Sequence, residues 1–407
     1  NPRKSCVFRL AVSLISDIRP EILQQAVKDC KPRFPSLYVR LRKGLFWHYF
    51  EANEKEPIIK PESPYINQYI EQINNNDYLF TVFYYQKRVS VELFHSLTDG
   101  MGAFEFVKTI IHRYFELQGC ELDDEGLVLR IDQKPDKAEI EDSYLRNFTR
   151  TGRRRLKARK AYRIPGTRLS TPGDFAVIIG KIPLEPLTSL ARENNASITQ
   201  YLAAVLAYCI GQDEAFEKSD KPININLPVN LRKIFKSRTM RNFSLYFLAT
   251  VECKDQDLSF ESILKQIKAQ FRQKLNKKNL QQNLNANVAL EKNLVFRLCP
   301  LLIKNTALKI AGKLFGDGST TSTISNGGVA LFPQSMQSLV TEVTGTLAVS
   351  NKATHSICTI YHNDQLFITF SRAVIETEIE RRFFTYLAAK GLKIEIQSNL
   401  RENMKER

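Results

Sequence analysis

The six residues His95-Ser-Leu-Thr-Asp99-Gly100 form the pattern H-x-x-x-D-G, which carries the clearest signal for acid–base chemistry in this chain. An imidazole titrates near neutral pH and can take a proton from a hydroxyl or an amine. Asp99 lies past a turn, where its carboxylate can form an ion pair or cap the following helix. Gly100 is expected to permit a backbone conformation that other residues resist. The competing interpretation is a partly buried structural histidine beside a simple helix cap.

A strand and a helix must flank this pattern if it is to present the imidazole at a cleft. Two stretches rich in Val, Phe and Tyr, Tyr78–Gln86 and Val89–Phe94, predict neighbouring strands joined by a short Lys-Arg turn. After Gly100 the apolar period changes from 2 to 3.6, which predicts a helix. The order strand, tight turn, helix places His95 at a strand end and favours the catalytic interpretation.

The rest of the chain predicts two α/β halves, 1–172 and 173–407. Residues 7–16 predict a strand, and Pro20 opens a helix. Residues 118–172 show little apolar periodicity and are expected to cross between the halves, with a boundary near Thr171-Pro172-Gly173. In the second half, Ser197 and Gln200 form a capping box before an apolar helix. Further strands are expected at 174–182, 223–229, 244–251, 355–361 and 366–370, and a late helix at 372–387.

Composition excludes several classes of protein. The 407 residues are 43% hydrophobic and 25% charged, which is typical of a globular chain and excludes disorder and coiled coil. The longest apolar run, Leu202–Ile210, is far shorter than the ~20 residues of a membrane span. Arg9 interrupts any signal-peptide core, so we expect a cytoplasmic protein. Seven cysteines without a C-x-x-C pair argue against a disulfide framework and a zinc site, and no metal is expected.

The net charge of +16 fits nucleic acid, an anionic membrane surface or a phosphorylated cofactor equally well. The excess gathers in two blocks: Arg153, Arg154, Arg155, Lys157, Arg159 and Lys160, and Lys265, Lys268, Arg272, Lys274, Lys277 and Lys278. A solvated face is the simpler interpretation of each block. Nucleic acid is not expected as a partner, because no aromatic-basic platform or DNA-reading motif is present.

The H-x-x-x-D-G segment resembles the active-site motif of the coenzyme A-dependent acyltransferase superfamily. That group includes chloramphenicol acetyltransferase, peptide synthetase condensation domains, plant BAHD acyltransferases and bacterial alcohol acetyltransferases. Further segments resemble alcohol acetyltransferase-like members in the same order: Arg33-Phe-Pro35, Gly44-Leu-Phe-Trp47, Leu227-Pro-Val-Asn-Leu-Arg232, Met240-Arg-Asn242 and Thr323-Ile-Ser-Asn-Gly-Gly328. Phe94 stands where condensation domains carry a second His, and the plant D-F-G-W-G motif is absent. The bacterial alcohol acetyltransferase-like branch is therefore the expected one.

The resemblance implies two chloramphenicol acetyltransferase-like subdomains, with mixed sheets flanked by helices and an active-site tunnel between them. It implies direct transfer of an acyl group, expected to be acetyl, with His95 at mid-tunnel as general base and no acyl-enzyme. Asp99 then supports the motif by pairing with an Arg of the other half, for which Arg232 is the candidate. Ser325 and Asn326 are candidate donors to the thioester or its oxyanion, with a plain turn as the alternative.

The resemblance also implies a co-substrate, acyl-coenzyme A, and a small or lipophilic alcohol acceptor, with no permanently bound cofactor. Lys265, Lys268, Arg272 and Lys274 are predicted to meet the coenzyme A phosphates, because an apolar helical stripe would turn them outward: Ile263, Ile267, Phe271 and Leu275. We expect a monomer, with a dimer as the alternative. Two other functions stay open: a carrier-protein thioester as donor to an amine or hydroxyl, and a non-catalytic binding or scaffold protein on the same fold.

Overall fold

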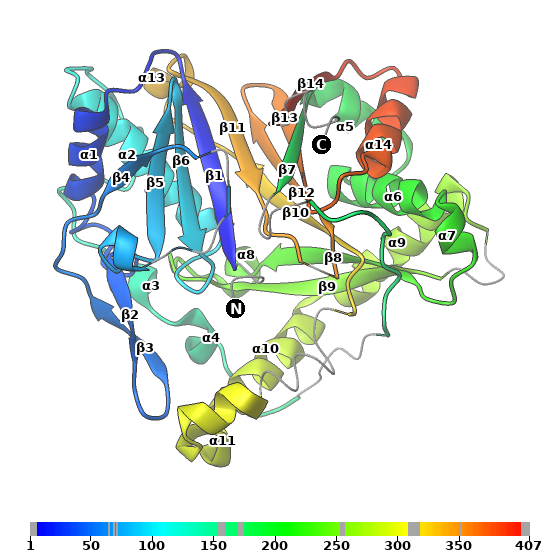
Figure 1. Ribbon diagram of the computed structural model, residues 1–407, viewed down its shortest axis with the longest axis horizontal. Helices are drawn as coiled ribbons and strands as arrows, with labels where there is room; N and C mark the ends of the chain where they lie inside the picture. The colour runs from blue at the N-terminus through cyan, green and yellow to red at the C-terminus, as the bar shows by residue number, and fades with distance from the viewer. Residues whose placement is uncertain are drawn as a thin grey trace.

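Two mixed β-sheets stand side by side in the molecule, each flanked by helices (Figure 1). The computed structural model describes residues 6–63, 66–67, 70, 72–152, 159–169, 175–252, 257–307, 318–350 and 352–399. The first sheet has the strand order β11-β1-β6-β5-β4, and the second has the order β14-β7-β13-β12-β10-β8-β9. The mixed sheets and flanking helices confirm the fold class expected from the sequence.

The first sheet is centred on β1 (Val7–Leu14), which pairs antiparallel with β6 (Arg88–Phe94) and with β11 (Val340–Thr346). β5 (Phe80–Tyr85) pairs antiparallel with β6, and β4 (Ile59–Pro61) pairs parallel with β5. β11 comes from the second half of the chain and lies between the two sheets, where it contacts β12 and β13 (Figure 1). The halves therefore share a sheet, which a division by sequence position does not convey.

The strand–turn–helix around His95 is present as predicted. The turn between β5 and β6 consists of residues 86–87, with Gln86 at a φ of 47°, so Arg88 belongs to the strand and not to the turn. Helix α2 (Gly100–Glu116) follows the motif and packs against α1 (Pro20–Asp29) and β1. Pro20 occupies the first turn of α1, where its missing N–H costs nothing.

Seven strands form the second sheet: β7 (Ala176–Pro183), β8 (Ile223–Asn230), β9 (Ser244–Val251), β10 (Ser322–Val329), β12 (His355–His362), β13 (Gln365–Arg372) and β14 (Glu395–Ser398). β10 runs parallel to both of its neighbours, and the other pairs are antiparallel. The strands expected in this half are therefore confirmed, with ends shifted by a few residues.

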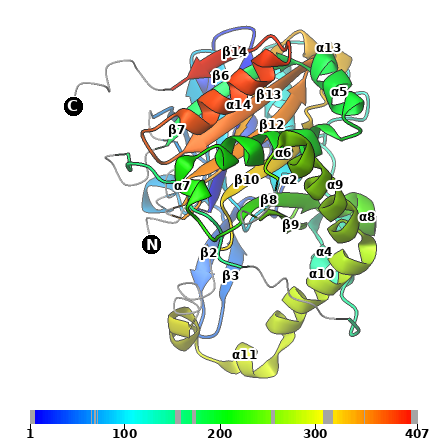
Figure 2. The ribbon, with the colours of Figure 1, turned by 90° about the vertical axis from the view of Figure 1, so that its right-hand side faces the viewer.

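We call each sheet with the helices packed on it a lobe. Four longer helices belong to the second lobe: α5 (Leu184–Glu193), α6 (Ile198–Gly211), α9 (Phe260–Lys274) and α14 (Glu378–Ala389). Figure 2 shows α6 and α14 across the outer face of the sheet. The Ser197–Gln200 capping box is present, and α6 is apolar all round because α9 and α14 pack on it. α14 begins at Glu378, six residues later than predicted, because Arg372 still pairs in β13.

The remaining elements connect or project from the two lobes. A hairpin of β2 (Val39–Lys43) and β3 (His48–Ala52) extends from the first lobe. α10 (Lys277–Lys292) and α11 (Leu294–Leu298) extend beneath both. Short elements complete the described chain: η1 (Gln72–Asn75), α3 (Lys137–Ile140), α4 (Ser143–Arg146), α7 (Glu214–Glu217), α8 (Arg232–Phe235) and α13 (Gln334–Gln337).

Part of the predicted crossover falls outside the described residues. Arg153, Arg154, Arg155 and Lys157 of the first basic block do so, as does the expected boundary at Thr171-Pro172-Gly173. The division into 1–172 and 173–407 therefore stays a prediction. Arg159, at the end of that block, forms an exposed ion pair with Glu252 at 3.0 Å.

The glycine that the motif region requires is Gly102 and not Gly100. Gly100 is the first residue of α2, its φ is not positive, and a Cβ added there would meet nothing within 4 Å. The expectation that Gly100 adopts a conformation closed to other residues is therefore wrong. A Cβ on Gly102 would collide with Met240 O and Thr98 Oγ1, since the start of α2 lies directly against the Met240 segment.

Gly102→Ala is expected to lower the free energy of unfolding by about 1–3 kcal/mol, because the colliding atom of Met240 is backbone and cannot rotate away. Urea denaturation followed by circular dichroism measures the effect. Gly100→Ala is the matched control in the same helical turn and should leave the midpoint nearly unchanged. Equal midpoints for the two variants would contradict this close approach.

Candidate active site

His95 lies directly after β6, and its half-buried side chain lines a pocket between the two lobes. Its backbone N–H donates to Cys6 O at 2.8 Å, and its ring lies 4.8 Å from that of Phe8, centre to centre. The pocket is a cavity of about 60 Å³ lined from both halves of the chain: Phe8, Arg9, Leu10, His95, Gly100, Phe104, Ser325, Gly327, Ala330, Gly345, Leu347, Cys358 and Ile360. His95 is thus open to solvent at a cleft, while a through tunnel stays a prediction.

A buried ion pair fixes the turn after His95. Arg232 Nη1 lies 2.7 Å from Asp99 Oδ2, and both side chains are less than 10% exposed. The same carboxylate oxygen accepts from the backbone N–H of Phe243 at 2.8 Å, and Oδ1 accepts from Gly102 N at 3.3 Å. The pair expected between the two halves is therefore present. Asp99 faces the second lobe and caps α2, which suits a supporting role.

Arg232 serves several acceptors at once. Its guanidinium donates to Thr239 O at 2.8 Å, to Arg241 O at 2.8 Å and to Asn230 Oδ1 at 3.2 Å, in addition to Asp99. A planar guanidinium with five N–H groups fits such a set, whereas a lysine ammonium offers three donors from one point. Arg232 therefore holds the 239–241 segment against the motif, and this segment precedes the residue that contacts His95.

Asn242 is the functional neighbour of His95 that sequence reasoning did not single out. Its Nδ2 donates to His95 O at 3.0 Å and lies 3.2 Å from His95 Nδ1, while Ser244 Oγ donates to its Oδ1 at 2.9 Å. The signal in the sequence was the Met240-Arg-Asn242 segment, which carried a resemblance but no assigned role. The spacing of residues 147 positions apart gives no hint of this contact.

The Asn242 side chain can serve both neutral forms of the imidazole. With Nδ2 toward the ring it donates to an unprotonated Nδ1. Turned by 180°, its Oδ1 would accept from a protonated Nδ1 and Nδ2 would donate to Ser244 Oγ, at the cost of the bond from Nδ2 to His95 O, which becomes a contact between two acceptor oxygens. The second arrangement leaves Nε2 unprotonated, which is the form that a general base at Nε2 requires.

Ser325 lines the pocket and Asn326 does not. Both residues lie in β10, so the interpretation of Ser-Asn-Gly-Gly as a plain turn is wrong. The register of β10 shifts between Asn326 and Val329, where Gly328 has a φ of 80°. Asn326 is exposed, donates from Nδ2 to Thr199 Oγ1 at 2.9 Å and accepts from Gly328 N at 2.8 Å. Asn326 thus shapes the irregular strand, while Ser325 is one of the residues that line the pocket.

Two further side chains in the pocket lining limit its chemistry. Burial raises the pKa of the Cys358 thiol to about 12, so it stays protonated at neutral pH and is a poor nucleophile. Arg9 lies 2.6 Å from Glu62 and 3.2 Å from Glu92, so its charge is already balanced. Burial also raises the pKa of the Glu92 carboxyl. His95 is left as the lining side chain suited to proton transfer at neutral pH.

The second basic block lies away from this pocket. Its first four members are on α9, which packs on β9 and α6, and Lys277 and Lys278 begin α10. Lys265 and Arg272 are exposed as predicted. Lys268 Nζ donates to Asn194 O at 3.1 Å. Lys274 is the exception to the predicted outward orientation: its Nζ donates to Leu248 O and Gln270 Oε1, both at 2.6 Å, and burial lowers its pKa. Leu275, expected in the apolar stripe, is 39% exposed.

The two histidines of the second lobe, His355 and His362, have structural partners. His362 contacts Ala330 O and Val340 O at 3.3 and 3.0 Å, and His355 Nδ1 lies 2.8 Å from Thr354 Oγ1. Burial, together with Arg372, lowers the pKa of His355 to about 3. In the described part of the chain, no three His, Cys, Asp or Glu side chains gather as metal ligands. Within the same residues, no helix has the length and apolar character needed to cross a bilayer.

Comparison with solved structures finds the same architecture along nearly the whole chain. TRI101 of F. sporotrichioides, solved with coenzyme A and T-2, superposes with a TM-score of 0.65 at 10% identity, covering 97% of each chain. TRI3 trichothecene 15-O-acetyltransferase from Fusarium sporotrichioides gives 0.58 at 12% identity, over 96% of this chain and 92% of that one. The first condensation domain of the CDA synthetase gives 0.57 at 12%, over 96% and 92%.

These likenesses show the fold: the chain has the two-subdomain, chloramphenicol acetyltransferase-like architecture of condensation domains and coenzyme A-dependent acyltransferases. No family model matches the sequence, and no curated protein matches it either. Identities of 10–12% leave the branch, the reaction and the substrates to be argued from the residues of the site.

Arg232→Ala is expected to lower the free energy of unfolding by about 3–5 kcal/mol, because it leaves the Asp99 carboxylate buried without its cation. Arg232→Lys should recover only part of the loss, since one ammonium cannot reach all four acceptors. Chemical denaturation measures both.

Lys31→Ala, which breaks an exposed pair with Glu54, is the control and should cost at most about 1 kcal/mol. A loss no larger than this in Arg232→Ala would show that the buried pair does not hold the two lobes.

Proposed function

We propose that the protein is an acyltransferase that moves a short acyl group, acetyl in the first place, from acyl-coenzyme A to an alcohol. The observation that carries the proposal is the position of His95. Its half-buried side chain lies at a pocket lined by both lobes, and the Asn242 amide contacts its ring at Nδ1. The acyltransferase fold of the chain supports the same assignment. TRI101 was solved with coenzyme A, and TRI3 is named an O-acetyltransferase.

In the proposed reaction His95 Nε2 takes the proton of the acceptor hydroxyl as the hydroxyl oxygen attacks the thioester carbonyl carbon. The new C–O bond forms, and the negative charge moves to the carbonyl oxygen, toward which the Ser325 hydroxyl is the candidate donor. The C–S bond then breaks, and the leaving thiolate takes the proton from the imidazolium. No covalent acyl-enzyme is required, which agrees with the protonated state of Cys358.

The dimensions of the pocket support a short acyl group. A cavity of about 60 Å³ is well below the ~300–1,000 Å³ of sites that enclose drug-sized ligands. Phe104 narrows it and is itself held by edge-to-face packing on Phe332, with ring centres 5.4 Å apart. A long acyl chain would have to displace such side chains. The acceptor is a small or lipophilic alcohol, since most of the lining is apolar.

Coenzyme A is the proposed donor over a carrier protein because TRI101, which has the same fold, was solved with coenzyme A. Lys265 and Arg272, exposed on α9 away from the pocket, are the proposed contacts of its nucleotide phosphates, whereas Lys268 and Lys274 would first have to leave their carbonyl partners. A carrier-protein donor and an amine acceptor are the alternatives. The proposed enzyme belongs to the alcohol acetyltransferase-like branch and acts as a monomer in the cytoplasm.

His95→Ala is expected to lower kcat by about 10²–10⁴-fold, the usual contribution of a general base, with only a small change in stability because the side chain is not part of the buried core. Thiol release from acetyl-, butyryl- and octanoyl-coenzyme A with a panel of alcohols measures it.

His48→Ala removes an exposed histidine elsewhere and is the matched control. Unchanged turnover in His95→Ala would refute the mechanism. Absence of thiol release by the wild type with every donor and acceptor would instead favour the non-catalytic binding function. A comparison of acetyl-coenzyme A with acetyl-pantetheine, which lacks the nucleotide phosphates, measures the contribution of those phosphates.

Replacing Asn242 is expected to separate orientation from chemistry. Asn242→Ala should lower kcat about 10–100-fold with little change in KM, because the ring loses its only side-chain support among the hydrogen bonds described. Asn242→Asp should retain more activity than Asn242→Ala, since a carboxylate accepts from protonated Nδ1 and leaves Nε2 as the base, although it loses the hydrogen bond to His95 O. The pH–rate profile is measured for both variants, and equal losses in the two would contradict a role in selecting the tautomer.

A further inference from the structure

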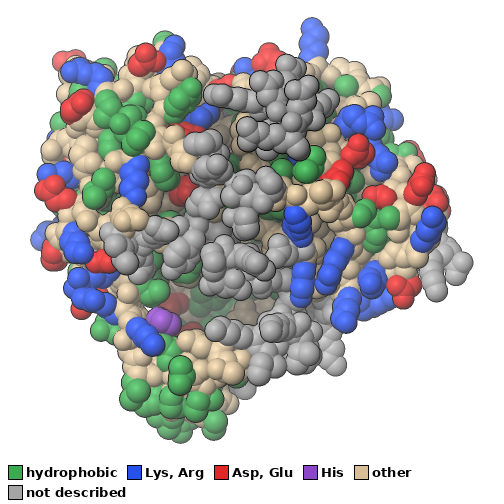
Figure 3. Space-filling model, in the orientation of Figure 1, with side chains coloured by type: hydrophobic (Ala, Val, Ile, Leu, Met, Phe, Trp, Pro, Cys, Tyr) green, Lys and Arg blue, Asp and Glu red, His purple; other side chains and the backbone are tan. Residues whose placement is uncertain are grey.

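The lower end of the molecule carries a surface of exposed apolar side chains that the pocket does not use. We call it the apolar tip; it consists of Leu45, Phe46, Trp47, Tyr49 and Phe50 of the β2–β3 hairpin and Leu294, Val295, Leu298, Leu302 and Ile303 of α11 and the helical residues 301–307. The most exposed are Val295 at 81%, Leu302 at 76% and Leu45 at 71%. Figure 3 shows hydrophobic side chains gathered on the projection at the lower edge.

The apolar tip is one body although its two segments lie about 250 residues apart in sequence. Leu301 N donates to Leu45 O at 2.9 Å, and Lys304 Nζ donates to Phe46 O at 2.9 Å. The same ammonium lies 3.4 Å above the Trp47 ring, which in turn packs edge-on against Phe296. These contacts hold the exposed side chains on a fixed support, so their exposure is a property of the fold.

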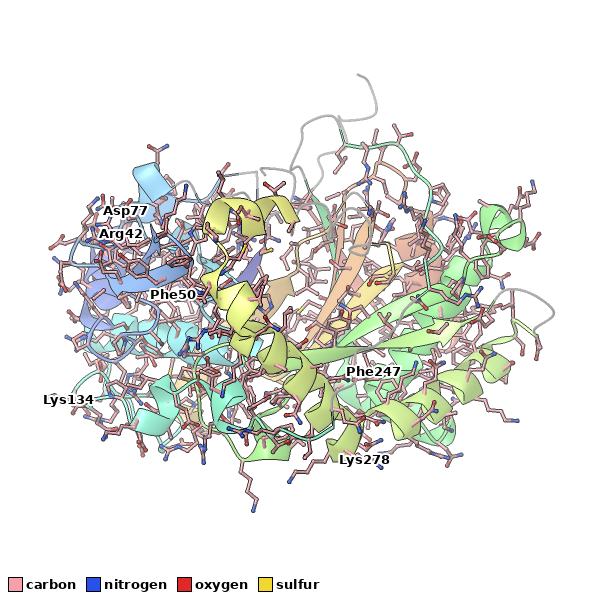
Figure 4. The ribbon with its side chains drawn as sticks, turned by 90° about the horizontal axis from the view of Figure 1, so that it is seen from below. Arg42, Phe50, Asp77, Lys134, Phe247 and Lys278 are labelled. Atoms are coloured by element: carbon pink, nitrogen blue, oxygen red, sulfur yellow. The ribbon has the colours of Figure 1, made fainter. Side chains whose placement is uncertain are left out.

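The tip projects and does not enclose anything. Figures 1 and 2 place the hairpin and α11 together below both lobes, and Figure 4, seen from below, shows Phe50 beside the ribbon of the α11 region. A contiguous apolar surface of this kind marks a protein–protein or membrane contact. A projecting surface suits a broad, deformable partner, whereas a peptide or small molecule needs a groove.

The charges around the tip are mostly positive. Residues 42–50 and 292–304 contain five basic side chains, Arg42, Lys43, Lys292, Arg297 and Lys304, and no Asp or Glu. Lys43, Lys292 and Arg297 are exposed, whereas Lys304 is only 2% exposed. Two acids adjoin these ranges: Glu51, which pairs with Arg42 at 3.0 Å, and Glu291. Apolar side chains including Trp and Tyr, bordered by cations, are the combination that binds the interface of an anionic bilayer.

We propose that the apolar tip inserts into the surface of a bilayer rich in anionic lipid, so that the protein lies on the membrane without spanning it. The cations provide the attraction to lipid headgroups, and the aliphatic and aromatic side chains provide the insertion. A second copy of this chain would place the exposed cations of one tip, Lys43, Lys292 and Arg297, against those of the other, which disfavours it as the occupant. The proposal is independent of the acyl transfer proposed above, because it concerns a different surface and a different measurement.

The single tryptophan of the chain, Trp47, lies in the tip and reports on it directly. Vesicles of phosphatidylcholine with and without phosphatidylglycerol are titrated into the full chain while the Trp47 emission is recorded. The expected result is a blue shift with the anionic vesicles and quenching by lipids brominated in the acyl chain. Binding should weaken as salt rises, since the attraction is partly electrostatic. Unchanged emission and no cosedimentation with anionic vesicles would overturn the proposal.

Val295→Glu with Leu302→Glu places two acids on the tip at exposed positions, and should raise the lipid concentration for half-maximal binding about tenfold or more. Ile15→Glu with Ile396→Glu is the matched control, since these side chains are 52% and 53% exposed and β14 lies at the opposite end of the molecule (Figure 1). Equal losses in both double variants would mean that added negative charge alone prevents binding, and would refute insertion of the tip.

Lys43→Gln with Arg297→Gln tests the cations without changing the apolar area. This variant should lose affinity for anionic vesicles at low salt and behave like the wild type at high salt. Light scattering without lipid measures the oligomeric state and so tests the competing occupant, a second copy of this chain. A wild-type dimer that Val295→Glu with Leu302→Glu dissociates would assign the tip to a second copy and overturn the membrane proposal.

Discussion

The buried pair between Asp99 and Arg232 is the interaction on which the site depends. It joins residues 133 positions apart, one at the start of α2 and one at the start of α8. A carboxylate removed from water needs a cation and hydrogen bonds in fixed directions, and Arg232, Phe243 N and Gly102 N supply them. Because Phe243 follows Asn242, the same interaction sets where the Asn242 amide meets His95. The two lobes are thereby joined next to His95, the residue that the proposed acyl transfer requires.

The pocket next to this pair separates polar support from reactive groups. Arg9 is balanced by Glu62 and Glu92, and the Cys358 thiol is kept protonated by burial. His95 is thus left as the proposed proton-transfer group in a small, largely apolar cavity. The strand β11, which leaves the second half to pair with β1, brings Gly345 and Leu347 to the opposite wall. A site of this kind depends on both halves, and neither sheet alone contains it.

The distribution of charge changes the meaning of the +16 total. On α9, the ammonium groups of Lys268 and Lys274 donate hydrogen bonds to backbone carbonyls, so part of an apparent basic patch stabilises helix and strand contacts. At the apolar tip, by contrast, Lys43, Lys292 and Arg297 are exposed beside hydrophobic side chains. The same residue type thus has different consequences according to what surrounds it. Net charge alone cannot distinguish an anionic partner from internal support.

Short-range pattern determined much of the fold. The strands on either side of residues 86–87, the helix after Asp99 and the Ser197 capping box all depend on residues within a few positions of each other, and the candidate Asp99–Arg232 pair came from motif resemblance. The tertiary structure alone decided the contact of Asn242 with His95, the need for Gly102, the inward Lys274 and the placement of β11 in the first sheet. These features join residues far apart in the chain, and their geometry is set by packing, which leaves no periodic trace in the order of amino acids.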